Sequence, residues 1–445
     1  MSASPFPSVN EAEAAVAQTA VRLASRVCRE AQLQLKDLRQ QDRNTDRLVS
    51  TTVLACQALL ASVLQQGLPN QPLSIVAATD FALLRAPQSA PIAKKIHEDI
   101  NRLLSRQPGY RAATDTEFAD LIWEGVSKGG PTGHHWIINP IDGIEGFTDL
   151  RQYGIAVALL ECGKVVLSVL ACPNLPQEPI LAIGPIDEVE RQDYEARRHR
   201  RFGDSSWNEG GWSHKPPWEG LATTPEFISK PSLQEDVPDS VGCLFVAIRG
   251  HGAYQLPLFG ADASTSVRLP LRPYPPNFHP RKNRIFIVIE PAEGRFHSHG
   301  RFTDEDNSYD TCIRSDGQTQ YAVLARGDAV TLHVGGPHSI WDHAAGILLA
   351  EESGYCVSNA AGAPLDMSSG TKLNIDHGIV ASHPSRHAQA LEDAKTCYVR
   401  RTHLKWLAAV INSGVATGAA LEHAASSYET SKDYVLGSMT DGISG

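Results

Sequence analysis

Carboxylates placed beside glycines are the residues of this sequence whose types and spacing could support chemistry. The segment 136–147 reads WIINPIDGIEGF, so Asp142 follows a hydrophobic run and precedes Gly143. A strand that ends at Asn139 and the following proline would present Asp142 in a loop. There, a carboxylate could hold Mg²⁺ through oxygen ligands while backbone N–H groups approach a phosphate. The alternative for these residues alone is a Pro/Asp/Gly turn that carries an ordinary solvated aspartate.

A second carboxylate, Asp342, lies in the segment IWDHAAG at 340–346, which we expect to open an apolar helix. An acid in the first turn complements the helix dipole, which explains this residue without a catalytic role. Two histidine pairs, at 134–135 and 297–299, each lack a third ligand at helical spacing. We therefore expect surface or loop roles for them. The sequence contains no nucleophile elbow, Walker loop or dinucleotide-binding glycine motif.

Hydrophobic periodicity indicates helices and strands in both halves of the chain. Apolar residues at helical spacing predict helices over 11–34, 52–64, 91–105, 116–126, 318–325, 340–352 and 403–425. Short β-type runs predict strands over 73–77, 136–138, 154–160, 164–171, 243–248, 285–290, 329–334 and 378–381. This mixture favours an α+β or α/β layered sandwich.

Changes in composition divide the chain into four expected regions. They are an N-terminal α+β subdomain with the metal or phosphate loop at 1–175, a Pro-, Trp- and Gly-rich insertion at 176–240, a C-terminal α/β subdomain at 241–400 and a helical tail at 401–445. The insertion shows little periodicity, which is typical of a long surface segment.

The bulk composition argues against some classes of partner. The chain has 445 residues, with 40 Lys and Arg against 50 Asp and Glu and a formal net charge of −10. Neither a nucleic-acid polymer nor an anionic membrane is expected as a partner, because both require an excess of basic side chains. The apolar run at 154–160 is too short to span a bilayer. Eight scattered cysteines, and an N-terminus without the pattern of a secretory signal, favour a cytoplasmic protein with reduced thiols.

Several segments together resemble one family. The loop after residue 136 and the WDHAAG segment resemble the D-P-I-D-G-T loop and the W-D-x-A-A-G helix start of the inositol-monophosphatase superfamily. Its 3′(2′),5′-bisphosphate nucleotidase branch is the closer match, because similar segments follow in order at 129–136, 152–160, 163–166, 169–175, 242–245, 249–254, 321–328 and 364–366. The resemblance runs from about Val53 to Ser382. It implies an α-β-α-β-α sandwich and Mg²⁺-dependent hydrolysis of phosphomonoesters.

The departures from this resemblance are concentrated at the metal positions. Asp142 and Asp342 remain as expected metal ligands, whereas Asn139 stands where the family has an aspartate. Ala78 and Thr79 replace two glutamates of the family. A Mg²⁺ site here is therefore expected to be weakened or lost, since this ion requires clustered oxygen ligands.

The positions that the resemblance assigns to catalysis and substrate binding are also altered. Ile144 replaces a threonine that orients the attacking water, and Val53 stands where its aspartate partner is expected. The resemblance places the phosphate- or substrate-binding positions at Gly143, Ile144, His297, Ser298, Gln318 and Gln320. Of these, Gln320 replaces a lysine of the family, and the neighbouring Gly317 replaces a residue with a hydroxyl group.

The leading hypothesis is a bisphosphate-nucleotidase-like protein that has lost most of its metal ligands. It would be inactive as a phosphatase, or repurposed in a pathway of its own, and would bind a small phosphorylated metabolite or a molecule derived from one. A Mg²⁺-dependent phosphatase acting on nucleotides like 3′-phosphoadenosine 5′-phosphate, or on inositol phosphates, is the first alternative. A non-enzymatic interaction module is the second. The sequence predicts neither the substrate nor the oligomeric state.

Overall fold

The computed structural model of the 445-residue chain describes residues 11–40, 46–79, 81–85, 87–124, 127–179, 241–259, 265–271, 285–289, 310–314, 317–334, 339–373, 375 and 378–394. His297 and Ser298, most of the expected insertion and the helix expected over 403–425 lie outside these residues.

A large sheet forms the centre of the N-terminal half and continues beyond the expected insertion. Within the described residues it has seven strands in chain order: β1 (Ile75–Ala77), β2 (His134–Asp142), β3 (Gly154–Glu161), β4 (Lys164–Pro176), β5 (Val241–Ile248), β6 (Gly252–Pro257) and β7 (Val267–Arg268). β1 pairs with β2 in parallel, and the other neighbours are antiparallel. The expected boundary at residue 241 therefore falls inside one sheet.

Both faces of this sheet are buried. Successive side chains of a strand point to opposite faces. In β2, for example, Ile138 belongs to the apolar cluster on one side and Ile137 to the cluster on the other, and in β5 Val246 and Phe245 divide in the same way. Such strands consist of almost continuous apolar residues because neither face meets water.

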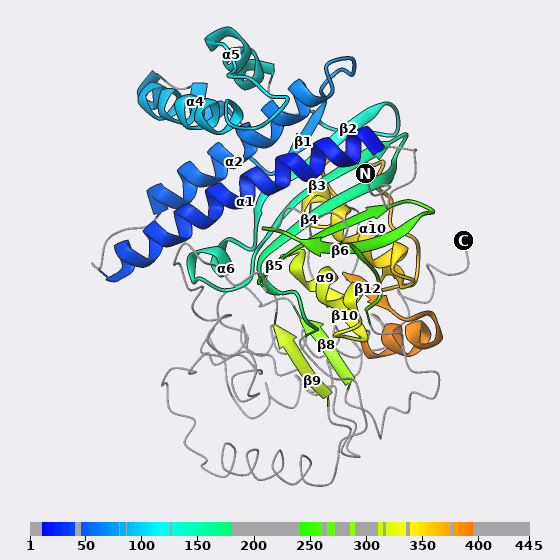
Figure 1. The fold of residues 1–445 in the computed structure, drawn as a ribbon. Helices are drawn as coiled ribbons and strands as arrows, with labels where there is room; N and C mark the ends of the chain where they lie inside the picture. The colour runs from blue at the N-terminus through cyan, green and yellow to red at the C-terminus, as the bar shows by residue number, and fades with distance from the viewer. Residues whose placement is uncertain are drawn as a thin grey trace, which may run out of the picture.

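Two long helices cover one face of the large sheet. Figure 1 shows α1 (Glu11–Gln40) and α2 (Asp46–Gly67) side by side, and both contact the sheet. The buried face of α1 carries apolar residues at intervals of three and four, at Ala17, Val21, Ala24, Cys28, Ala31 and Leu35. The shorter helices α3 (Ala82–Arg85), α4 (Ala90–Leu104) and α5 (Asp115–Glu124), with the 3₁₀ turn η1 (Pro87–Ser89), complete this outer layer.

Two helices lie between the large sheet and a smaller one. α9 (Thr319–Arg326) and α10 (Ala344–Glu352) are buried along almost their whole length because they are covered on both sides. The smaller sheet has the order β11-β12-β10-β8-β9, formed by β11 (Cys356–Asn359), β12 (Ile379–Ser382), β10 (Thr331–Val334), β8 (Ile285–Ile289) and β9 (Asp310–Arg314).

A last helical segment covers the far side of the smaller sheet. Ala390 and Ala394 of the helix at 387–394 pack with Val380 of β12, whose neighbours Ile379 and Ala381 face the middle helices. The layers are thus α-β-α-β-α, and the predicted α+β layered sandwich is confirmed.

Some boundaries differ from the sequence-based prediction. β2 does not end at Asn139 but continues to Asp142, since its pairing with β3 resumes after an irregularity between these residues. The helix predicted to start at residue 340 begins instead as a 3₁₀ turn, η3 (Ile340–Asp342), and α10 follows from Ala344.

The second long helix is the more apolar of the two and has the length of a membrane span. Within the described residues, the stretch Leu48–Gly67 is long and apolar enough to cross a membrane, with a mean hydropathy of 1.6. In the folded chain this stretch belongs to α2, and 61% of its most apolar window is buried inside the protein. A core helix explains its composition.

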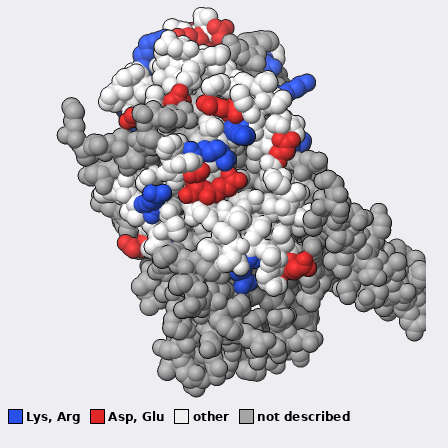
Figure 2. All heavy atoms as spheres, turned by 90° about the vertical axis from the view of Figure 1, so that its right-hand side faces the viewer, with Lys and Arg blue, Asp and Glu red and all other residues white. Residues whose placement is uncertain are grey.

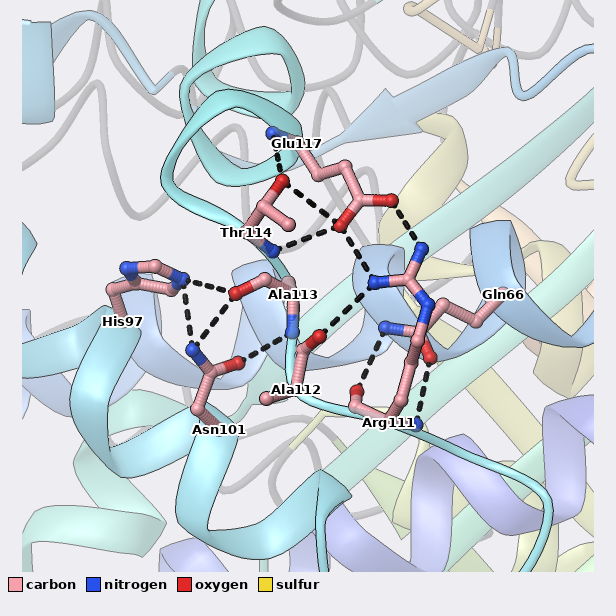
Figure 3. A network of polar contacts seen from close by, with 8 residues as sticks. All are labelled: Gln66, His97, Asn101, Arg111, Ala112, Ala113, Thr114 and Glu117. Atoms are coloured by element: carbon pink, nitrogen blue, oxygen red, sulfur yellow. Dashed lines mark hydrogen bonds and ion pairs between the residues drawn. The ribbon is translucent and has the colours of Figure 1, made fainter.

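A network of polar contacts joins the outer helices (Figure 3). Asn101 of α4 donates from Nδ2 to the carbonyl oxygen of Ala113 and accepts the Ala113 N–H at 2.7 Å. Gln66 of α2 contacts the backbone of Arg111 through both ends of its amide. The connection between α4 and α5 is therefore held by hydrogen bonds to α4 on one side and to α2 on the other.

Acidic and basic side chains are interspersed over the described part of the face in Figure 2. On that part of the surface the basic groups do not form a continuous stripe of the kind that follows a phosphate backbone.

Candidate functional site

The structure brings Asp142 and Gln318 together at the junction of the large sheet and the middle helices. Asp142, at the end of β2, is 8% exposed, and its Oδ2 accepts the backbone N–H of Gln318 at 2.6 Å. Gly317 makes this approach feasible. A Cβ atom there would lie 2.6 Å from Asp142 Cγ, and the φ of +57° is one that side-chain-bearing residues rarely adopt. The sequence therefore needs glycine beside this carboxylate.

Asn139 and Asp342 form the second contact of the cluster. Asn139, also on β2, donates from Nδ2 to Asp342 Oδ1 at 3.3 Å. Without a cation between the two groups, the amide faces the carboxylate with its nitrogen, because the opposite orientation would place two oxygens against each other. The other oxygen of Asp342 accepts the N–H of Ser339 at 3.0 Å, which secures the start of the η3 turn.

The side chain of Gln318 joins the two middle helices. Its Nε2 donates to the Trp341 carbonyl oxygen at 2.9 Å, and its Oε1 accepts the Gly346 N–H at 2.8 Å. Gln318 is fully buried, so the structure places this expected substrate-binding residue inside the cluster, where it orients Asp142 and η3. Gln320, the second residue of α9, is 1% exposed, and within the described residues its Oε1 has no hydrogen-bond partner.

A cation contacts this cluster from a neighbouring segment. The exposed Lys372 donates from Nζ to Ser339 Oγ at 3.2 Å, and an isolated β-bridge joins the backbones of the two residues. Lys372 is thus linked through Ser339 to Asp342. The sequence reading missed both residues, and no motif around them marks a site.

The loop after Asp142 carries an exposed apolar side chain. Gly143 has a φ of +84° and precedes the five-residue helix α6 (Ile144–Thr148). Ile144, at the first position of this helix, is 42% exposed, which is uncommon for isoleucine. Where the resemblance expects a hydroxyl group, the structure therefore presents hydrocarbon.

The remaining expected positions lie where α2 meets the end of β1. Ala78 follows β1 and donates its N–H to the Ile138 carbonyl oxygen at 3.3 Å, next to Asn139. Thr79 accepts a hydrogen bond at its carbonyl oxygen from Gln57 Nε2. Val53 is one helical turn before Gln57 and thus on the same side of α2.

The structure therefore gathers Asn139, Asp142, Asp342 and Gln318 in one hydrogen-bonded cluster. It places Gly143 and Ile144 directly after Asp142, and Ala78 beside Asn139. Within the described residues, no group of three or more His, Cys, Asp or Glu side chains is close enough to hold a metal ion. The carboxylates of Asp142 and Asp342 each accept N–H groups of the protein itself.

Comparisons with known proteins agree with this architecture. The profile of the inositol monophosphatase family matches residues 7–398. The chain belongs to the inositol monophosphatase family. A 3′(2′),5′-bisphosphate nucleotidase of Oryza sativa is 32% identical over 378 residues, which cover 84% of this chain and 90% of the relative. The 3′(2′),5′-bisphosphate nucleotidase 1 of Arabidopsis thaliana is 30% identical over 350 residues, or 77% and 84% of the two chains.

Solved structures of the inositol monophosphatase family are also similar. CysQ from Bacteroides thetaiotaomicron, a bacterial member of the family, covers 84% of this chain and 97% of its own, with a TM-score of 0.45 and 14% identity. The family profile and the nucleotidase relatives confirm the predicted resemblance, and the chain is a bisphosphate-nucleotidase-like member of this family.

Proposed function

We propose that this protein binds a small phosphorylated metabolite, or a molecule derived from one, without hydrolysing it by the Mg²⁺-dependent reaction of phosphatases. The proposal places the ligand at the cluster of Asn139, Asp142 and Asp342. The protein would act as a silent ligand binder, or as an enzyme with a different reaction.

The hydrogen bond from Asn139 to Asp342 is the observation that supports the proposal most strongly. A carboxylate in a magnesium site is neutralised by the cation that it coordinates. Here an uncharged amide N–H donates to the carboxylate instead. A cation between the two side chains would require the amide to turn and give up this hydrogen bond, and Asn139 would then offer one neutral oxygen in place of a charged carboxylate.

The other donors are equally poor for this ion. Asp142 Oδ2 lies 2.6 Å from the Gln318 nitrogen, so a metal at that oxygen would have to displace a short backbone hydrogen bond. Ala78 has no side-chain oxygen, and the Thr79 hydroxyl carries no charge. The described side chains therefore do not fit a two-metal site, and we derive no hydrolytic step through Mg²⁺.

The two positions that the resemblance assigns to orienting water point the same way. The side chains of Ile144 and Val53 are hydrocarbon, so neither can hold or deprotonate a water molecule. Residues that act as one catalytic unit depend on one another, so the loss of several of them removes most of the activity.

Electrostatics restrict the position of a phosphate in such a site. Without a cation, Asp142 and Asp342 would repel a phosphate dianion placed against them. Lys372 supplies a positive charge at the Ser339 side of the cluster. We therefore expect the anionic group of the ligand near Lys372 and an apolar part near the exposed Ile144.

Phosphate release from adenosine 3′,5′-bisphosphate, with and without Mg²⁺, tests the proposal. We expect no release above background from the full-length protein. Release that depends on Mg²⁺ and is abolished by Asp142→Ala would contradict the proposal. A variant with Ala78→Glu, Thr79→Glu, Asn139→Asp and Ile144→Thr is expected to gain Mg²⁺ binding in a calorimetric titration, although turnover is expected to need Val53→Asp as well.

A Mg²⁺-dependent phosphomonoesterase is the second candidate. It is favoured by the proximity of Asp142 and Asp342 in one cluster and by the names of the relatives. Calorimetry separates the two candidates: a phosphatase should bind adenosine 3′,5′-bisphosphate more tightly when Ca²⁺ replaces Mg²⁺ as a slow-turnover cation than in the presence of a chelator. The proposed binder should show the same affinity under both conditions.

A further inference from the structure

Two cysteine side chains lie next to each other behind the candidate site. Cys28 of α1 and Cys56 of α2 are both fully buried, and their Sγ atoms are 3.4 Å apart. The two residues are 28 positions apart in the chain, and the helices that carry them pack along one another (Figure 1).

We propose that Cys28 and Cys56 form a reversible disulfide that joins α1 to α2 and stiffens the candidate site from behind. The formation of this disulfide depends neither on a ligand nor on the reaction that the protein performs.

The geometry requires only a small movement. A disulfide has an S–S distance of about 2.05 Å, so the two sulfurs must approach by roughly 1.3 Å. Rotation of the side chains about χ1, with a slight shift of two helices that already touch, can supply such a movement. The chain enclosed by the new bond would include the connection between α1 and α2.

The two helices contact the site through glutamines close to these cysteines. Gln32, one turn after Cys28 on the same face of α1, donates from Nε2 to the Phe147 carbonyl oxygen of α6 at 3.1 Å. Gln57, next to Cys56, donates to the Thr79 carbonyl oxygen. The thiol pair therefore lies behind the two segments that carry Ile144 and Thr79.

A buried phenol borders the same space. Tyr153 packs edge-on against Phe147, with ring centroids 5.0 Å apart, and within the described residues its hydroxyl has no hydrogen-bond partner. Burial raises the pKa of Tyr153 and of the Cys28 thiol. The hydrogen bond with Cys56 raises the pKa of Cys28 further, and the nearby thiols raise that of Tyr153. Cys28 thus stays protonated at neutral pH, and because both sulfurs are buried, oxidation must follow a local opening of α1 from α2.

A peroxide is the oxidant that we assign to this step. One thiol loses its proton, the thiolate attacks a peroxide oxygen, and the O–O bond breaks to give a sulfenic acid and hydroxide, which takes up the released proton to form water. The second thiol then attacks this sulfur, an S–S bond forms and a second water leaves. Two thiols and one hydrogen peroxide give one disulfide and two waters. The two electrons lost by the sulfurs reduce the peroxide, and a dithiol reductant reverses the change.

The test exposes the full-length protein to hydrogen peroxide and then blocks the remaining thiols. We expect peptide mapping to find the Cys28 and Cys56 peptides joined, with the intact mass lower by two hydrogens for this bond. The melting temperature should rise by several degrees, and amide hydrogen exchange in residues 144–148 should slow by about fivefold or more. Dithiothreitol should restore the original values.

Matched variants separate this bond from other oxidation. Cys28→Ala and Cys56→Ala should each abolish the linked peptides and the slower exchange. Cys162→Ser changes an exposed thiol in the β3–β4 turn and should leave both unchanged. If Cys28 and Cys56 stay reduced in the wild-type protein while Cys162 is oxidised, the proposal is overturned. A linked pair without any change in exchange at 144–148 would overturn the effect on the site. Both of these outcomes are measured on the wild-type protein, so they do not require that a variant fold or that a ligand bind.

Discussion

The Asn139 amide stabilises Asp342 only while it is uncharged and can donate. Asn139→Asp removes the N–H donor and places a second negative charge about 3.3 Å from the Asp342 oxygen. We expect the free energy of unfolding to fall by about 1–3 kcal/mol, as measured by chemical denaturation in the presence of a chelator. Because the new carboxylate pair can share a cation, Mg²⁺ should restore part of this loss.

Asn174 offers a matched control for this substitution. It is a buried asparagine whose Nδ2 donates to the Arg151 carbonyl oxygen at 2.6 Å, in a different network. Asn174→Asp should also destabilise the protein, but Mg²⁺ should not restore its stability. Equal rescue of both variants would show that Mg²⁺ acts elsewhere.

Gly317 is a second position where one atom decides the geometry of the site. A methyl group at Gly317 would collide with Asp142 and would also have to adopt a φ of +57°. Gly317→Ala should therefore lower the free energy of unfolding by about 2 kcal/mol or more, the sum of backbone strain and displaced contacts.

Gly109→Ala measures the strain alone. Gly109 has a φ of +83° and no atom within 4 Å of the position of a Cβ. Denaturation curves of the two variants should differ, with Gly317→Ala the less stable. If both lose the same amount, the contact with Asp142 does not matter for stability.

The first turn of α5 shows how one helix depends on its capping residue. Thr114 precedes the helix and donates its N–H to Glu117 Oε2 at 2.8 Å, while its hydroxyl accepts the Glu117 N–H at 3.2 Å. This reciprocal pair is a capping box, and Arg111 adds an ion pair to Glu117 (Figure 3). The hydrogen bonds from Arg111 and Thr114 lower the pKa of Glu117 from 4.5 to about 2.

Stability should depend on pH through this carboxylate. A depressed folded-state pKa means that Glu117 stabilises the fold above its unfolded pKa of 4.5, and that this contribution is lost as the pH falls toward 2. Glu117→Gln should therefore lower the melting temperature slightly at neutral pH. The difference from the wild type should narrow on acidification below pH 4.5. A difference that stays constant across that range would contradict the assignment.

A buried ion pair connects the end of α9 to the large sheet. Arg326 and Asp328 are both fully buried and form an ion pair, and Arg326 also donates to the Pro176 carbonyl oxygen at the end of β4. Arg326→Met would leave the Asp328 carboxylate buried without its cation. The expected loss is about 3–5 kcal/mol in the free energy of unfolding. Adding Asp328→Asn should recover much of it, and denaturation of the single and double variants provides the comparison. A double variant no more stable than the single one would contradict this explanation.

At the scale of the whole molecule, the layers could be predicted from sequence because they depend on local patterns. Apolar spacing predicts the two long helices α1 and α2, most strands of the large sheet and helix α9. The strands β6, β7, β9 and β11 were not predicted. They are short or mixed in composition, and pairing with a neighbour rather than periodicity determines them.

The site was predicted in part. The positions of Asp142 and Asp342 followed from motifs, but their contacts did not, because these contacts join residues far apart in the chain. The bond between Asn139 and Asp342 spans 203 positions, and the one between Asp142 and Gln318 spans 176. Lys372 and Ser339 were missed because a lone lysine or serine has no distinguishing pattern. That Ala78, Thr79 and Asn139 stand where the resemblance expects acids stays a prediction from sequence. Only the fold shows that the carboxylates of Asp142 and Asp342 accept protein N–H groups.

The junction of β4 and β5 has a consequence for how such a chain can change over evolution. Pro176 is paired with Val241 in the sheet, and Gln177 Nε2 donates to the Gly242 carbonyl oxygen at 3.4 Å, although these last two residues are 65 positions apart. The backbone thus leaves and rejoins the sheet at one corner. The entropic cost of joining two such points rises only with the logarithm of the number of residues between them, so we expect this corner to tolerate a change in the length of the intervening sequence. A lineage can acquire a new surface there in a single genetic event while the strands that carry Asn139 and Asp142 keep their register.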